Sequence, residues 1–196
     1  MQLGNNSERY GLITVLIHWI MTVFIIGLFF LGLYMVGLDY YDPWYRKAPD
    51  LHRGFGVIVA FILVFRLFWR LANPLPESIG RPWERRTALW VHRLFYLLIA
   101  LITVSGYLIT TADGHALAVF DWFELPATLH GYDNQEDIAG IVHEWLSYIL
   151  IALVMLHSMA ALKHHFIDHD PSFRRILWPG KSIIPVLSTT THHTKE

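Results

Sequence analysis

The sequence predicts an all-α fold, an integral membrane four-helix bundle with both termini in the cytoplasm. Of its 196 residues, 54% are hydrophobic and only 16% are charged, whereas roughly 25% of residues are charged in soluble domains. Four stretches approach the ~20 apolar residues that a helix needs to cross a hydrocarbon core. Lys and Arg gather in alternate loops, as in membrane proteins whose basic loops stay inside. The net charge of −1 gives no field that would attract nucleic acid.

The limits of each predicted span are the positions of the charged residues that flank it. The first stretch has no charged residue over residues 10–38 and is too long for the apolar part of a signal peptide. The second is the weakest, because Arg66 and Arg70 interrupt its end. The third and fourth are uncharged over residues 94–112 and 145–162. We expect helices at about residues 10–36, 51–71, 88–110 and 138–166, within a transmembrane domain of residues 1–180 that is followed by a cytoplasmic tail, residues 181–196.

The loops predict which way the chain crosses. Residues 111–140 hold six acidic residues and neither Lys nor Arg, whereas residues 72–90 hold three arginines. Because basic loops remain inside, residues 37–50 and 111–140 should face outward. Within the second outer loop, the segment VFDWFELP is expected to lie on the outer surface with its aromatic side chains toward the membrane.

The fourth stretch carries two histidines that define the candidate site. His143 and His157 are fourteen residues apart, which in a helix is a rise of about 21 Å and a return to within about 40° of the same face. Both imidazoles therefore face one side of the helix, at two depths. A histidine within the hydrocarbon region is costly and faces the bundle interior, so it marks a functional site by default.

The same fourteen-residue step recurs on the other three predicted helices, so that two levels form. The outer level holds two histidines and two glycines: His52, His143, Gly32 and Gly106. The inner level holds three histidines and an arginine: His18, His92, His157 and Arg66.

This inventory suits a flat macrocycle bound at each level of a bundle core. Such a group needs two axial ligands from opposite sides and small residues where its edge meets a backbone. The chain has no cysteine, which excludes thioether attachment, so the hypothesis is two non-covalent b-type haems. Arg66 would pair with a haem propionate. Spacing alone leaves open whether His18 or His92 faces His157.

Simpler interpretations compete with this one. A single buried histidine often makes only a hydrogen bond between helices, Arg66 can reach the inner interface, and Gly32 and Gly106 can be packing glycines. A zinc site needs three or four clustered ligands, which the outer level lacks. A proton or metal transporter lined by histidines is a further alternative, although a proton relay would call for an Asp or Glu within the membrane. The one acidic residue of the four predicted helices is Glu144, which is expected at the outer interface.

Several segments resemble the bacterial di-haem cytochrome b561 family. They are LIHWI, LHRGFG with the later FRLFWRLANPLP, LWVHRLFY and, most specifically, HEWLSYILIALVMLHSMAALKHHFIDHDPSFRRILWPG. The resemblance covers nearly the whole chain. It implies a multi-pass cytochrome of the bacterial inner membrane that exchanges electrons with the quinone pool. It also implies that His18 and His157 ligate the inner haem iron, and that His52 and His143 ligate the outer one.

The resemblance also guides the remaining expectations. His92 becomes a residue near the inner haem edge, and with His164 it is a candidate for the quinone site. Ubiquinone or another quinone would enter from the membrane lipid at the inner level and take protons from His164, His165 or Lys163. An unidentified periplasmic donor or acceptor would meet the outer haem.

Two questions of function follow from the resemblance. Some relatives oxidise superoxide at the outer side and reduce ubiquinone, so a quinone-linked oxidoreductase of that type is one possibility for this chain. The acidic outer loops would on average repel the superoxide anion. The alternative is a haem b membrane anchor within a larger oxidoreductase, similar to the cytochrome subunits of hydrogenases and dehydrogenases.

Overall fold

A computed structural model describes residues 2–77, 80–170 and 172–177. Four long helices dominate it, which confirms the predicted fold class, and all four are long and apolar enough to cross a membrane. In chain order the elements are α1 (Leu12–Val36), α2 (Lys47–Ala72), α3 (Pro82–Thr110), the strands β1 (Leu117–Val119) and β2 (Phe123–Leu125), α4 (Gln135–Phe166) and the short α5 (Ser172–Leu177). The predicted tail, residues 181–196, lies outside the described residues.

Three of the four helices begin earlier than the hydropathy of the sequence indicates. α3 begins at Pro82, a residue suited to the first helical position because its missing N–H would be unbonded there anyway. The backbone N–H of Arg81 donates to Oε2 of Glu84 at 2.7 Å, which holds this helix start. α4 begins with Glu136 and Asp137 in its first turn, where negative charge favours the helix dipole. Polar first turns are thus helical although they lie outside the apolar spans.

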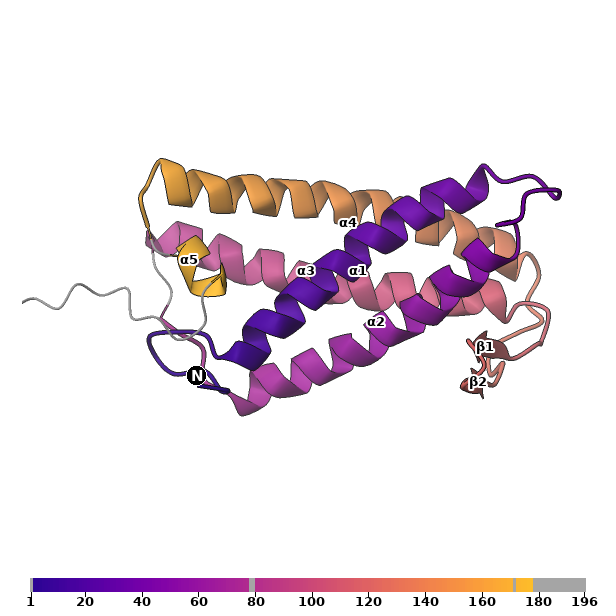
Figure 1. Ribbon diagram of the computed structural model, residues 1–196, viewed down its shortest axis with the longest axis horizontal. Coiled ribbons are helices and arrows are strands. Elements are labelled where there is room, and N and C mark those ends of the chain that lie inside the picture. The colour runs from indigo at the N-terminus through magenta and orange to yellow at the C-terminus, as the bar shows by residue number, and fades with distance from the viewer. Residues whose placement is uncertain (1, 78–79, 171, 178–196) are drawn as a thin grey trace, which may run out of the picture.

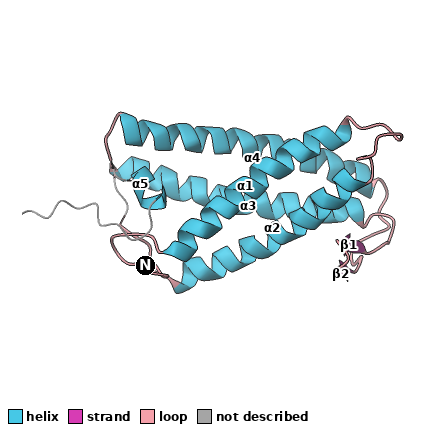
Figure 2. Ribbon diagram, in the orientation of Figure 1, coloured by secondary structure: helices cyan, strands magenta, loops and turns pink. Residues whose placement is uncertain are grey.

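The helices pair into two layers that pack against each other. α1 runs mainly along α2, and α3 runs mainly along α4. The N-terminus and α5 lie at one end of the bundle, while the two strands lie at the other (Figures 1 and 2). This places the termini that the structure describes at the end predicted to face inward.

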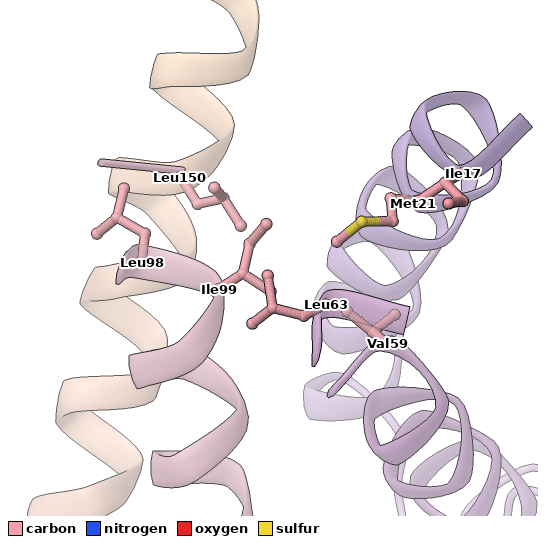
Figure 3. Packing of buried hydrophobic residues seen from close by; sticks show 7 residues of the cluster. All are labelled: Ile17, Met21, Val59, Leu63, Leu98, Ile99 and Leu150. Atoms are coloured by element: carbon pink, nitrogen blue, oxygen red, sulfur yellow. The ribbon is translucent and has the colours of Figure 1, made fainter. Parts of the chain in front are cut away.

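A buried apolar cluster fills the middle of the bundle between the two layers. Leu150 lies seven residues from both His143 and His157, and Val59 lies seven residues after His52. These side chains and their neighbours meet from all four helices (Figure 3): Ile17, Met21, Val59, Leu63, Leu98, Ile99 and Leu150. The two histidine levels are therefore separated by a packed apolar layer.

At the inner end, hydrogen bonds join segments that are far apart in the sequence. Asn5, which is only 8% exposed, accepts from the N–H of Gly11 and the hydroxyl of Thr14 and donates to the carbonyl of Pro74. The indole N–H of Trp19 donates to the carbonyl of Ile176 at 3.0 Å, which joins α1 to α5. The N-terminal segment and α5 thus close the inner end of the bundle.

The outer loop between α3 and α4 forms a hairpin. β1 and β2 pair antiparallel, with Leu117 opposite Leu125. The side chains of Leu117 and Val119 are buried, while Trp122 is 72% exposed. Within this segment, the ring of Phe120 lies against Phe55 of α2.

Candidate functional site

The outer level brings two histidines close together. His52 on α2 and His143 on α4 come from opposite layers, and their ring centres are 6.1 Å apart. A metal–imidazole bond is about 2.0 Å long and the ring centre lies about 1.1 Å beyond the nitrogen, so two imidazoles on one metal have ring centres about 6 Å apart. The observed spacing is compatible with two imidazoles that bind one metal ion from opposite sides.

The orientation of His143 is held by hydrogen bonds on one side of its ring. Nδ1 lies 3.0 Å from the carbonyl of Ile102 and 3.2 Å from the hydroxyl of Ser105. An Nδ1–H that donates to the carbonyl leaves Nε2 free to bind a metal, which is the usual arrangement of a ligating histidine. The ring of His52 interacts with the backbone of Leu28 on α1, although its buried Nδ1 makes no hydrogen bond of good geometry to the described residues.

The two predicted glycines lie against these imidazoles rather than in open space. A Cβ on Gly32 would be 3.4 Å from Cε1 of His52, and a Cβ on Gly106 would be 3.2 Å from Cε1 of His143. Each glycine lies in the layer of the histidine that it touches, on the neighbouring helix. The absent side chains therefore give each imidazole room to lie over a helix backbone.

A cavity of about 720 Å³ opens between the layers at this level. Its volume falls within the range of roughly 300–1,000 Å³ that is typical of ligand pockets. Both histidines line it, together with Gly56, Gly106 and the exposed Arg53. A Cβ on Gly56 would meet nothing within 4 Å, so this face of α2 is also open.

The inner level brings the other predicted residues together. His92 and His157 have ring centres 5.6 Å apart, and His18 lies close enough to both, and to Arg66, to interact with them electrostatically. Nδ1 of His92 lies 2.7 Å from the carbonyl of Ala88, so an N–H there leaves Nε2 facing away from its own helix.

The layers distinguish the inner histidines. His92 and His157 lie on α3 and α4, which pack along each other in one layer, whereas His18 lies on α1 in the other layer. The outer pair spans the two layers, and at the inner level only a pair that includes His18 does so.

Arg66 meets an aromatic residue that the sequence did not single out. Its Nε donates to the hydroxyl of Tyr96 at 3.2 Å. Tyr96 lies one helical turn after His92, and this spacing would have placed it on the same face. Ser105 was missed as well, and no pattern in the sequence marks it.

The quinone candidate His164 lies in a charged cluster at the inner end. Its Nδ1 is 2.7 Å from Oδ2 of Asp168 and 3.4 Å from Oδ2 of Asp170. The ammonium of Lys163 lies 2.7 Å from the same oxygen of Asp168 and 3.9 Å from Glu84 of α3. The hydrogen bond from Lys163 holds the pKa of Asp168 below its ordinary value.

Comparison with known proteins identifies the family. The model of the family described as prokaryotic cytochrome b561 matches residues 9–179. The chain belongs to the prokaryotic cytochrome b561 family. It is 45% identical over 184 residues to cytochrome b561 homolog 2 of Escherichia coli (strain K12), covering 93% of this chain and 97% of that protein. The resemblance predicted from the sequence is therefore confirmed.

Two more distant relatives extend the comparison. A protein of Yersinia pestis named probable superoxide oxidase CybB is 22% identical over 173 residues, covering 87% of this chain and 96% of that protein. Cytochrome b561 homolog 1 of Escherichia coli (strain K12) is 21% identical over 174 residues, covering 87% and 97%. As a member of this family, the chain is a transmembrane electron-transfer protein that uses haem b.

The outer level fits haem b as a group. His52 and His143 would hold a haem from opposite layers, and the 6.1 Å between their ring centres leaves room for one metal ion between them. The cavity is lined mostly by apolar side chains, as a porphyrin requires. Arg53 and Thr110 lie at its lining and offer polar contacts.

Proposed function

We propose that this cytochrome carries electrons across the bacterial inner membrane through two b haems and exchanges them with the quinone pool. The observation that carries the proposal is the His52–His143 pair, which faces across the two layers at the spacing of axial ligands. A bound haem supplies a one-electron ferric/ferrous couple. His52 and His143 hold the outer one, and the fixed Nδ1 hydrogen bond of His143 orients the ring.

For the inner haem, we assign His18 and His157 as ligands. The support is that this pair, like the outer pair, comes from opposite layers. Arg66, within electrostatic range of His18, supplies positive charge for a propionate. His92, beside His157, lies next to the haem edge. A bis-histidine iron has no open position, so redox partners exchange electrons at the porphyrin edge.

We place the quinone site at the inner end, near His164 and within reach of the lipid. His164 and Lys163 share the carboxylate of Asp168. A quinone reduced there takes up two protons, and a histidine held between two carboxylates is suited to pass a proton on. His92, at the inner level, is the second candidate for contact with the quinone.

The charge distribution supports a periplasmic outer end and cytoplasmic termini. The outer segments, residues 37–53 and 111–137, hold nine acidic and three basic residues, while most Lys and Arg lie at the other end. We treat residues 1–180 as one transmembrane domain and residues 181–196 as a cytoplasmic tail.

Superoxide oxidation at the outer side is a second candidate, favoured by the name of the Yersinia pestis relative. In that reaction each superoxide gives one electron and leaves as oxygen, and two of them reduce one quinone. The acidic outer loops predict that the rate rises with salt, because screening weakens the repulsion of an anion. Superoxide consumption by the purified protein at several salt concentrations tests this; a rate no greater than spontaneous dismutation excludes the substrate.

The main proposal is tested with protein reconstituted in vesicles that contain ubiquinone. Quinol is expected to reduce both haems in the unaltered protein. The variant His157→Ala should retain an outer haem that dithionite reduces but that quinol reduces much more slowly. Equal reduction by quinol in this variant would place the quinone elsewhere.

A further inference from the structure

The outer hairpin is seated firmly on α2 by one aromatic side chain. A Cβ on Gly54 would lie 2.6 Å from Cζ of Phe120, so the Phe120 ring occupies the space that any other residue would fill. Phe120 has φ of +49°, a backbone conformation that is uncommon for a bulky residue and persists where the surroundings impose it. The hairpin is therefore held in place rather than loosely attached.

Aromatic rings connect the surface of this hairpin with the outer histidine level. Trp122 is 72% exposed, its ring centre lies 5.2 Å from that of Phe120, and Phe120 lies 5.3 Å from Phe55. Phe55 follows His52 by three residues on α2, which is about one helical turn. A continuous set of ring contacts thus leads from solvent to within a turn of the proposed ligand.

The surface around Trp122 is acidic. Asp121 precedes it and Glu124 follows two residues later, and both are exposed. Glu136 and Asp137 at the start of α4 are accounted for by the helix dipole, but the carboxylates of the hairpin have no such structural role. Of the three outer basic residues, Arg53 is paired with Asp50. The outer end therefore carries an excess of negative charge, and two of its exposed carboxylates flank an exposed indole.

We propose that this surface, Trp122 with Asp121 and Glu124, is the docking site of a positively charged soluble redox protein. The proposal rests on the function proposed above and names the class of its periplasmic partner. Complementary charge speeds encounter, and exposed aromatic residues are the typical anchors of an interface. One electron crosses for each partner bound, so two partner molecules are reduced for each quinol oxidised to quinone, with two protons released.

The competing role for Trp122 is an anchor at the membrane interface, where tryptophans are common. Two carboxylates beside it disfavour that role, because an anionic side chain is costly to bring to the acyl boundary. The anchor is one of the outcomes that the experiment below distinguishes.

The probe is oxidised mitochondrial cytochrome c, which is strongly basic, together with the same protein after succinylation of its lysines. The cytochrome is reduced with dithionite, freed of excess reductant in detergent, and mixed with each probe in a stopped-flow instrument. We expect the native probe to react at least about ten-fold faster at about 10 mM salt than at about 200 mM salt. The succinylated probe should react at least about ten-fold more slowly at low salt.

Variants locate the effect on the hairpin. Asp121→Asn with Glu124→Gln should lower the low-salt rate about three- to ten-fold. Glu8→Gln with Glu77→Gln removes the same charge from the inner end and should leave the rate within about two-fold. Trp122→Leu should lower the rate at saturating probe, and Trp122→Phe should restore most of it.

Results that would refute the docking site differ from those that would refute the proposed electron-transfer function. If the hairpin variants react as fast as the unaltered protein, or if salt has no effect, the docking proposal is wrong and the anchor role for Trp122 is favoured instead, although haem reduction by quinol still stands. If dithionite reveals no b-type band, the proposed function itself is wrong.

Discussion

Gly106 offers a direct way to disturb one haem and leave the other in place. A Cβ there would lie 3.2 Å from Cε1 and 3.4 Å from Nδ1 of His143. Carbon atoms prefer separations of about 3.5–4.0 Å, so Gly106→Ala must push Cε1 of the imidazole away by about 0.3–0.8 Å. Gly106→Val adds two further methyl groups in the same space.

The expected magnitude follows from the cost of overpacking. Extra groups in a packed site cost about 1–3 kcal/mol, and each 1.4 kcal/mol is a factor of about ten in an equilibrium constant. Gly106→Val should therefore weaken retention of the outer haem about five- to 150-fold, while Gly106→Ala falls at or below the lower end. The inner haem, about 21 Å away along α4, should be unaffected.

The assay is transfer of haem to excess apomyoglobin, followed by the haem content per chain. Gly27→Val is the matched control, because a Cβ at Gly27 meets nothing within 4 Å, and it should keep both haems. Gly106→Val is expected to fall from two haems to one. If Gly106→Val keeps two haems and loses them no faster than Gly27→Val, His143 is not held where we place an axial ligand.

Three other predictions address the inner end. His18→Ala should lose the inner haem while His92→Ala keeps both, as measured by haem content; loss of one haem in His92→Ala would reverse the inner assignment. Asn5→Ala removes three hydrogen bonds from a buried site and should lower the free energy of unfolding by about 1–3 kcal/mol in a thermal or denaturant assay in detergent; an unchanged midpoint would show that the hydrogen bonds of Asn5 do not stabilise the inner end. Because Lys163 lowers the pKa of Asp168, their contact should contribute stability above the ordinary carboxyl pKa and lose it as the pH falls through the lower folded value; a carboxyl NMR titration with an ordinary midpoint for Asp168 would contradict this.

The fold was predictable because the dominant signal in this sequence is hydropathy. Four apolar spans and the alternation of basic and acidic loops decide the number of helices, and the family match agrees with them. The helix starts were not predictable from hydropathy, because the first turns of α3 and α4 are polar and are fixed by Pro82 and by acidic residues instead.

The sequence predicted the part of the candidate site that follows from the regular spacing of residues along a helix. A step of fourteen residues placed His52 and His143 at one level, and the structure brings their rings together. The contacts of Ser105 with His143 and of Tyr96 with Arg66 depend on how neighbouring helices pack, which the sequence of one helix does not encode.

The outer hairpin is a clearer example of a contact between elements that the sequence does not predict. The placement of Phe120 against Gly54 joins residues 66 positions apart. The sequence around a helical glycine and the sequence around a loop phenylalanine do not predict that the two residues are in contact. Only the tertiary structure reveals that the outer loop reaches the neighbourhood of His52.

Haem content per chain is the measurement that tests the central claim most directly. We expect two haems in the purified protein, one in His143→Ala, one in His157→Ala and none in the double variant, with reduced-minus-oxidised spectra that show a b-type α band whenever haem is present. A single haem in the unaltered protein, or two haems in His143→Ala, would contradict the two-level arrangement.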